Sequence, residues 1–293
     1  EPHIRETVAS IRAQTYQDFE VVAVNDGSTD TTGEILDEIT REWNAEADTL
    51  YPKMRVIHQH NAGLAKARNV AIAAMTGEYI ALQDSDDLWT PEKLSDCMAF
   101  FAGNPSLSIV YTPMQPFDDA TGKLMEGHSK PCHAGQLTEK LFMSIFVHDP
   151  SAVFHRRVID TCGGFCEEIP VSIGHEFWLR VAPHFEFGLI DEPLAMRRWT
   201  PHSLTRRNRL RGRQIKTRIL EQFYFEGGGK ELIPRRHAMR RLAKVNYHAG
   251  KILLKERRGR EAVPYLAKAL KYRPTYLRVY PQFLAALLIA IVR

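Results

Sequence analysis

Cysteine is scarce in this sequence. Its 293 residues include four cysteines, Cys97, Cys132, Cys162 and Cys166, and no two of them form a Cys-x-x-Cys pair. Three residues separate Cys162 from Cys166, and no matching cluster of histidines accompanies them. This usage gives no sign of a disulfide framework or of a zinc site, and it predicts reduced thiols in a cytoplasmic protein.

Long hydrophobic runs are also missing. The one apolar run near the end, Phe283–Val292, has ten residues, about half of the roughly 20 that a membrane-spanning helix needs. It predicts a helix that either packs in a core or lies in a membrane interface. The sequence opens Glu1-Pro2-His3 and shows no secretory signal peptide.

Net charge is small, at +4, but it is unevenly distributed. Residues 197–293 hold 25 of the 39 lysines and arginines and 5 of the 35 acidic residues, a net charge of +20, which leaves −16 for residues 1–196. A basic region of this kind predicts an anionic partner, such as the surface of the cytoplasmic membrane. The alternative is that its helices are simply solvated or dock on the acidic part. It lacks the interleaved aromatics of a recognised nucleic-acid module, so no nucleic-acid partner is expected.

Apolar spacing predicts helices and strands that alternate along the first third of the chain. Such an order predicts an α/β fold in which helices cover a mostly parallel sheet. Further along, the pattern predicts a helix over 91–101 and a strand over 107–112, then a hairpin or loop over 113–135. The first six predicted elements are helix His3–Gln14, strand Phe19–Val24, helix Gly33–Trp43, strand Met54–His58, helix Leu64–Ala74 and strand Tyr79–Leu82.

Three carboxylates, Asp84, Asp86 and Asp87, directly follow the strand Tyr79–Leu82. Asp84 and Asp86 are two residues apart, so on an extended chain they point to the same side. Paired carboxylates at the end of a buried strand are typical of a site for Mg²⁺ or Mn²⁺, which prefer oxygen ligands. The alternative is a solvated acidic turn.

Polar segments follow each of the three early strands. They read VNDGSTDTT (24–32), NAGLAKARN (61–69) and QDSDD (83–87). In this order and at this spacing they resemble family-2 glycosyltransferases of the GT-A fold, over roughly residues 1–205. The resemblance implies transfer of a sugar, often from a UDP-sugar, to an acceptor hydroxyl with inversion. It also implies a carbohydrate or lipid-linked acceptor in the assembly of a polysaccharide, glycolipid or glycoprotein.

The resemblance also implies roles for single residues in binding the donor. Asp26, with Asn25 beside it, would accept a hydrogen bond from the nucleotide base. Gly63 would let the backbone come close, and Arg68 would lie near the base or the diphosphate. The alternatives are a helix-capping aspartate at position 26 and a solvated helix arginine at position 68.

For the metal and the sugar, the resemblance points to the acidic cluster and to the end of the transferase region. Asp84 would hold ribose or sugar hydroxyls, and Asp86 would ligate a Mn²⁺ or Mg²⁺ ion that bridges the donor diphosphate. A histidine often reaches the diphosphate or metal from the closing segment LAMRRWTPHSLT (194–205). Thr200 takes its usual place and His202 lies two residues further on, so His202 is either a further metal ligand or a surface histidine.

The chain departs from the family at the expected general base. The family has an acidic residue four or five positions before a Trp-Leu-Arg run, here Trp178-Leu179-Arg180, but those positions hold Ile173 and Gly174. Glu176 is the nearest acid and His175 stands beside it, and either side chain can take a proton. Glu176 is the first choice. If it only begins a helix, the base is missing, and the protein is a non-catalytic nucleotide-sugar binder or a scaffold.

The two ends of the chain carry two more expectations. Family members begin with a strand and a Pro-x-Tyr-Asn turn that this sequence lacks, so either the sequence is a fragment or one edge of its site is open. Residues 206–293 are predicted to form a separate basic helical region. Within them, residues 246–274 match the spacing of one tetratricopeptide repeat, which alone forms a helical hairpin rather than a solenoid. The matching residues are Gly250, Ala262, Leu266, Ala269 and Pro274.

Overall fold

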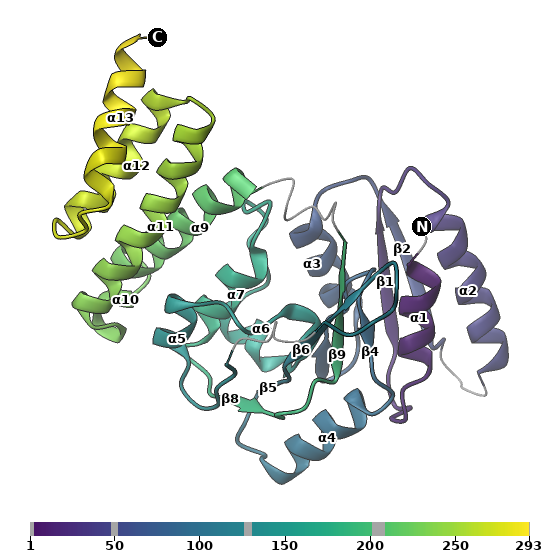
Figure 1. Ribbon diagram of the computed structural model, residues 1–293. Helices are drawn as coiled ribbons and strands as arrows, with labels where there is room; N and C mark the ends of the chain where they lie inside the picture. Colours follow the sequence, from purple (N-terminus) through teal and green to yellow (C-terminus); the bar gives the residue numbers. More distant parts are fainter. Residues whose placement is uncertain (1–2, 48–51, 126–130, 201–208, 293) are drawn as a thin grey trace. The chain divides into compact units, whose positions relative to one another are not determined.

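The computed structural model describes residues 3–47, 52–125, 131–200 and 209–292 (Figure 1). The chain forms two compact units. The first contains residues 1–137 and 146–200, and the second contains residues 138–145 and 201–293. His202 and the predicted domain boundary after residue 205 lie outside the described residues.

The first unit begins with the predicted alternation of helices and strands. Strands β1 and β2 pair in parallel, from Val21 opposite Met54 to Asp26 opposite Gln59. Helix α3 covers one face of this pair and α2 covers the other (Figure 1). Because parallel strands end at the same edge, the polar loops after β1 and β2 lie together. These elements are α1 (Ile4–Arg12), β1 (Val21–Asp26), α2 (Thr32–Glu46), β2 (Met54–Gln59) and α3 (Leu64–Ala74).

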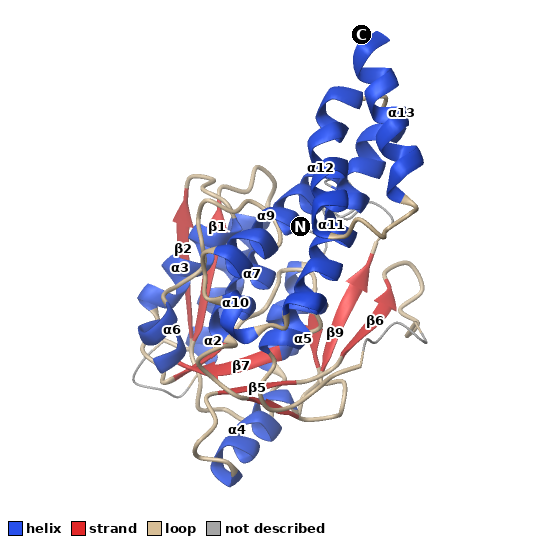
Figure 2. Cartoon of the chain, turned by 90° about the vertical axis from the view of Figure 1, so that its left-hand side faces the viewer, coloured by secondary structure: helices blue, strands red, loops and turns tan. Residues whose placement is uncertain are grey.

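The predicted α/β fold is confirmed, but the strands are less uniformly parallel than predicted, because the later strands form two mixed sheets (Figure 2). In the order β3-β7-β5-β8, strand β7 runs antiparallel to both β3 and β5, and only β5 and β8 are parallel. In the order β4-β9-β6, strand β9 is antiparallel to β4 and parallel to β6. A hydrophobic pattern marks a strand but not its direction, so these reversals could not be predicted from it. The strands are β3 (Tyr79–Ala81), β4 (Leu88–Trp89), β5 (Ile109–Tyr111), β6 (Met114–Asp118), β7 (Ala152–His155), β8 (Phe187–Leu189) and β9 (Ala195–Trp199).

Aromatic packing fixes helix α7 (Ile173–Val181) beside β7. Phe177 and Trp178 of this helix are completely buried, and the Trp178 ring meets Phe154 of β7 edge-on at 5.6 Å. Phe165 stacks on Phe177 at 4.4 Å. Burying aromatic side chains of this size anchors α7 firmly, so groups near its first turn have a well-defined position. The remaining helices of the unit are α4 (Lys93–Gly103), the 3₁₀ turn η1 (Asp149–Ser151) and α6 (Arg157–Cys162).

In its described residues, the second unit contains only helices and the loops that connect them. The two helices of the hairpin, α11 and α12, pack closely at Gly250, because glycine has no side chain there. A Cβ atom on Gly250 would lie only 2.6 Å from Cγ of Leu266. Ala262, Leu266 and Ala269 of α12 are completely buried. The likeness of this hairpin to a tetratricopeptide repeat stays a prediction. The helices are α5 (Thr138–Met143), α9 (Arg209–Phe225), α10 (Gly229–Leu232), α11 (Arg235–Lys255), α12 (Gly259–Tyr272) and α13 (Val279–Val292).

Helix α13 is apolar on both its covered and its uncovered face. Val279 and Ala286 are completely buried in the helical core. On the other side, large apolar side chains remain exposed over two-fifths to four-fifths of their surface. With 14 residues, α13 is too short to cross a bilayer, and no other described helix is long and apolar enough to do so. We name the exposed set, Leu277, Tyr280, Leu284, Leu288 and Ile291, the apolar stripe.

Candidate active site

The acidic cluster forms a tight turn between β3 and β4. The amide of Asp87 donates to the carbonyl of Asp84 at 3.2 Å, which closes the turn. Side chains alternate between two sides only along an extended chain, and residues 84–87 form a turn instead. The prediction that Asp84 and Asp86 point to the same side because the chain is extended was therefore wrong. Asp86 is exposed, Asp84 is partly buried and Asp87 is buried. The three carboxylates thus have three different environments.

Arg68 joins the acidic turn to a distant part of the chain. It lies on α3 with a side chain only 9% exposed, and it donates to Asp84 at 2.6 Å and to Asp149 of η1. Its guanidinium also lies 5.1 Å from the ring centre of Phe165. Buried charges of this kind are stable only when they are paired and hydrogen-bonded. The alternative of a solvated helix arginine is therefore wrong, and Arg68 and Asp84 do meet at one place.

Ionisation differs within the cluster. Burial and the neighbouring charges of Asp84 and Asp86 raise the pKa of Asp87 to about 8. Burial and the charge of Asp149 also raise the pKa of Asp84, although Arg68 opposes the shift. Asp87 therefore holds its proton at neutral pH.

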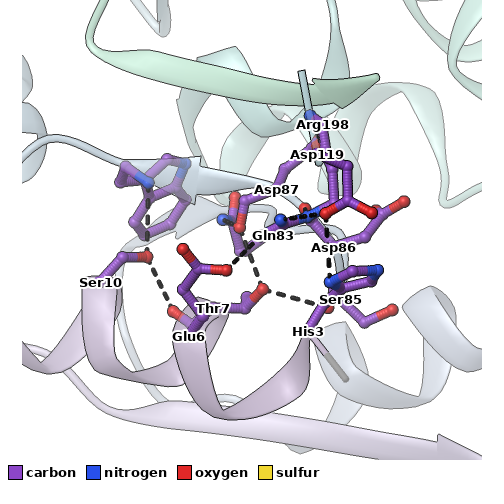
Figure 3. Close-up of polar contacts among 11 residues, drawn as sticks. His3, Glu6, Thr7, Ser10, Gln83, Ser85, Asp86, Asp87, Asp119 and Arg198 are labelled. Atoms are coloured by element: carbon purple, nitrogen blue, oxygen red, sulfur yellow. Dashed lines mark hydrogen bonds and ion pairs between the residues drawn. The ribbon is translucent and has the colours of Figure 1, made fainter. Parts of the chain in front are cut away.

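Arg198 of β9 holds the acidic turn in place (Figure 3). Its Nε donates to the carbonyl of Asp86 at 2.8 Å, and its backbone N–H donates to Asp87 Oδ1 at 3.0 Å. Its remaining nitrogens donate to Asp119 at 2.7 Å and to Glu6 at 2.5 Å. The Arg198 side chain is only 5% exposed. Reasoning from the sequence missed this residue, since nothing local distinguishes it from its neighbour Arg197.

Helix α1 supports the same turn from the other side (Figure 3). The Thr7 hydroxyl lies 3.0 Å from the carbonyl oxygen of Ser85 and 3.1 Å from that of Asp87. The side-chain amide of Gln83 donates to the Asp87 carbonyl at 2.7 Å. The backbone of the turn is thus held by side chains from α1 and β9 and by Gln83 of its own segment.

Asp26 connects the loops that follow β1 and β2. It accepts hydrogen bonds from the amides of Ala62 and Gly63, both at 2.8 Å, and from the Gln59 side chain at 2.7 Å. Burial raises its pKa, but these three bonds outweigh that effect and lower the pKa overall. Two carboxylate oxygens offer about four acceptor positions, so one is left for a ligand.

Close contacts bring the other predicted residues of these loops together. Gly27 has φ of 70°, and a Cβ atom on it would lie 2.6 Å from the amide nitrogen of Asn61, so only glycine fits this contact. Asn25 accepts from the Ser28 amide at 3.0 Å and lies 3.1 Å from His58. Nothing lies within 4 Å of a Cβ built on Gly63, which precedes the first turn of α3. The start of this helix is therefore open to a ligand.

Glu176 and His175, the predicted bases, lie on α7. Both oxygens of Glu176 pair with Arg180, at 2.7 and 3.0 Å. The same guanidinium donates to the carbonyls of Cys162 and Gly164 at the end of α6. Glu176 thus helps to connect α6 to α7, and His175 is buried, 5% exposed. That either residue acts as the base stays a prediction.

The donor atoms around Asp86 suit a hard divalent ion that also binds phosphate. No group of three or more histidine, cysteine or acidic side chains that could hold a metal lies within the described part of the chain. Mg²⁺ and Mn²⁺ commonly bind through one or two carboxylates and complete their shell with substrate phosphates and water. The exposed Asp86 carboxylate fits that demand, whereas Asp87 is buried and Asp84 is paired with Arg68.

Two solved structures share this fold. One is S. aureus TarS, residues 1–349, in complex with UDP-GlcNAc; its TM-score is 0.61 at 17% identity, covering 96% of this chain and 88% of that one. The other is mannosyltransferase PcManGT from Pyrobaculum calidifontis in complex with GDP-Man and Mn²⁺. Its TM-score is 0.62 at 19% identity, covering 98% of this chain and 82% of that one. The fold is that of the GT-A glycosyltransferases.

Sequence comparison identifies the family. The model described as Glycosyl transferase family 2 matches residues 1–163, more than half of the chain, so the chain belongs to this family. Chondroitin synthase from Escherichia coli is 31% identical over 180 residues, which is 61% of this chain and 24% of that protein. The chain thus spans about a quarter of this relative's length. The predicted resemblance is confirmed for the family and the fold.

Proposed function

We propose that the protein transfers a sugar from a nucleotide-diphosphate sugar to an acceptor hydroxyl with inversion, in polysaccharide assembly. The observation that carries the proposal is the meeting of three polar segments in one unit. Asp26 draws the loop before α3 toward the end of β1, and Arg68 of α3 holds Asp84 of the acidic turn. E. coli chondroitin synthase, a relative, supports a polysaccharide product, and the UDP-GlcNAc and GDP-Man complexes of similar folds support a nucleotide-sugar donor.

Each group has a role that its environment permits. Asp26 has one acceptor position left for the nucleotide base, and the open start of α3 at Gly63 favours negative charge from the diphosphate. Asp84, still 35% exposed, can accept hydrogen bonds from ribose or sugar hydroxyls. Asp86 would hold Mn²⁺ or Mg²⁺, which when bound stabilises charge on the leaving diphosphate. Arg198 keeps Asp86 in position.

The acceptor-side partner is proposed to be a carbohydrate or a lipid-linked carbohydrate at the cytoplasmic face of a membrane. The second unit offers a surface for an anionic membrane, because the apolar stripe lies beside exposed cations. Arg278 directly follows Leu277, and Arg260 donates to the carbonyl of Ala290. The second unit also has a groove of about 380 Å³, formed by residues that come before the apolar stripe in the sequence. Three arginines line it, and arginines suit lipid phosphates. It is lined by Arg236, Met239, Arg240, Tyr272, Arg273, Pro274 and Thr275.

A test of the donor site compares Asp86→Asn with Ser85→Ala, an exposed neighbour in the same turn. UDP and GDP are titrated into each variant with and without Mn²⁺. The Asp86→Asn variant should lose the Mn²⁺-dependent part of the affinity and keep its melting temperature, while Ser85→Ala should match the parent. Unchanged Mn²⁺-dependent binding in Asp86→Asn would contradict the proposal.

A non-catalytic nucleotide-sugar binder is the second candidate, because positions 173 and 174 carry no acid. The discriminating measurement is nucleotide release from UDP-GlcNAc and GDP-Man by the parent chain. Tight Mn²⁺-dependent nucleotide binding without any release would favour the binder.

A further inference from the structure

Gly174 lies directly against a carboxylate from another part of the chain. A Cβ atom built on Gly174 would be 2.2 and 2.4 Å from the two carboxylate oxygens of Asp149 and 2.6 Å from its Cγ. Real Cβ atoms do not approach other atoms so closely, so any larger residue at 174 would displace Asp149. The Asp149 carboxylate therefore occupies the space in which a side chain at 174 would begin.

Asp149 is held as an oriented carboxylate within the candidate active site. The indole N–H of Trp178 donates to its Oδ1 at 2.8 Å. Its Oδ2 accepts from Arg68, whose other nitrogen reaches Asp84 at 2.6 Å. The Asp149 side chain is 13% exposed, so it is desolvated but not sealed from solvent. Asp149 is thus fixed by a rigid donor and joined through one guanidinium to Asp84, for which sugar binding is proposed above. An oriented carboxylate in such a place can serve as a general base.

We infer that Asp149 is the general base of the transfer reaction and occupies the place left by Gly174. The inference rests on the proposed function. The acceptor hydroxyl oxygen forms a bond to the anomeric carbon while the bond from that carbon to the diphosphate oxygen breaks. The electron pair of the broken bond leaves on the diphosphate, and the hydroxyl proton passes to a carboxylate oxygen of Asp149. The hydroxyl becomes strongly acidic as its oxygen bonds to carbon, so a carboxylate can accept its proton.

The other acids near the site serve less well. Both oxygens of Glu176 pair with Arg180, which faces the end of α6. Asp87 is buried and closes the turn that carries Asp86. Asp149 and Glu176 are both partly exposed and both have their two oxygens hydrogen-bonded. What distinguishes Asp149 is its link through Arg68 to Asp84.

The first experiment measures nucleotide release from UDP-GlcNAc and GDP-Man with Mn²⁺, water serving as acceptor, in Asp149→Asn and Glu176→Gln. Asparagine keeps the size of the side chain and one acceptor oxygen, which can serve Trp178 or Arg68 but not both, and it cannot take the proton. Release by Asp149→Asn should fall about 10²–10⁴-fold, as the loss of a general base does, while its Kd for UDP with Mn²⁺ stays within about threefold. Glu176→Gln should lose less than about tenfold. Near-parental release by Asp149→Asn, or a large loss only in Glu176→Gln, would overturn the assignment.

A second experiment moves the carboxylate and separates its chemistry from any structural role. Gly174→Asp alone should be destabilised, because its side chain collides with Asp149. Combining it with Asp149→Gly removes the collision and returns one carboxylate to the neighbourhood of the lost one. The double variant should therefore regain at least tenfold of the release that Asp149→Gly alone has lost. No recovery in a folded double variant would count against Asp149 as the base.

The parent chain separates the failure of this inference from that of the proposed function. A parent that binds no nucleotide with Mn²⁺ overturns both. A parent that binds UDP or GDP but releases none from either donor favours the non-catalytic binder and likewise overturns both. A parent that releases nucleotide, with near-parental release in Asp149→Asn, overturns only the base.

Discussion

Replacing Arg198 tests whether the acidic turn is held in place by β9. In Arg198→Met the guanidinium disappears, and the carbonyl of Asp86 and the carboxylates of Asp119 and Glu6 lose their donors. The backbone bond from residue 198 to Asp87 remains, because it does not depend on the side chain. The strand pairing of β9 is therefore kept, and only the support of the turn is removed.

The expected loss follows from the contacts. A hydrogen bond to a charged group contributes about 1.5–3 kcal/mol, and one to a neutral carbonyl contributes about 1 kcal/mol. The pair with Glu6 counts for less than about 1 kcal/mol, since that carboxylate is 54% exposed. Together these give a decrease of about 3 kcal/mol in the free energy of unfolding. The loosened turn should also weaken Mn²⁺-dependent binding of UDP by at least about tenfold, or about 1.4 kcal/mol.

Arg197→Met is the matched control, because Arg197 is the exposed neighbour on the same strand. Urea unfolding at pH 7.5 gives the stability of each variant, and calorimetric titration of UDP with Mn²⁺ gives the affinity. The reasoning would be refuted if Arg198→Met kept parental stability and affinity, or if both variants lost the same amount.

Three further predictions concern other parts of the chain. Lys93 is completely buried and donates to the Ser151 carbonyl at 3.0 Å; burial lowers its pKa. The unfolded chain therefore binds more protons between that lowered pKa and about 10.4, so stability rises with pH in this window. Urea unfolding between pH 7 and 10 should show that the free energy of unfolding rises less with pH in Lys93→Met than in the parent and in the exposed control Lys123→Met. The same dependence on pH in Lys93→Met as in the parent would contradict this. Asp26→Asn should lower the free energy of unfolding by about 1–3 kcal/mol, because an amide cannot replace every acceptor that Asp26 offers to Gln59, Ala62 and Gly63; a variant with parental stability and UDP affinity would show that the loop does not need this carboxylate. Leu284→Ser combined with Leu288→Ser should release the protein from vesicles of phosphatidylserine and phosphatidylcholine at low salt, while Leu124→Ser, an exposed leucine of the first unit, should not. A parent that ignores such vesicles would rule out the membrane surface, and self-association that the double substitution abolishes would indicate a second copy instead.

Local signals predicted the first half of the fold well. The apolar spacing of Ile4, Val8 and Ile11 marks α1, and all three side chains are buried. The limits predicted for α3, Leu64–Ala74, are those observed, since Gly63 and Gly77 flank an unbroken helical pattern. That the chain lacks the first strand of the family stays a prediction.

Residues that act over long sequence distances could not be predicted in the same way. Arg68 and Asp149 are 81 positions apart, and Arg198 is 192 positions from Glu6. No periodicity links such pairs, because the folded sheets bring them together. Gly174 looked like a missing acid, and only its contact with Asp149 shows what fills the space. The three motifs that identified the family lie close to single strands, which is why they could be read from the sequence.

The assignment of α5 to the second unit has a consequence for synthesis on the ribosome. Leu141 and Phe142 of α5 are completely buried, and Phe142 packs against Phe223 and Tyr224 of α9. Its other partner, α11, begins at Arg235, about 100 residues later. At 5–20 residues per second the nascent chain exposes these side chains for roughly 5–20 s before their partners emerge. A truncated gene that ends near residue 200 would leave them uncovered permanently, so we expect such a fragment to aggregate or to need a chaperone, even though it contains every residue of the candidate active site.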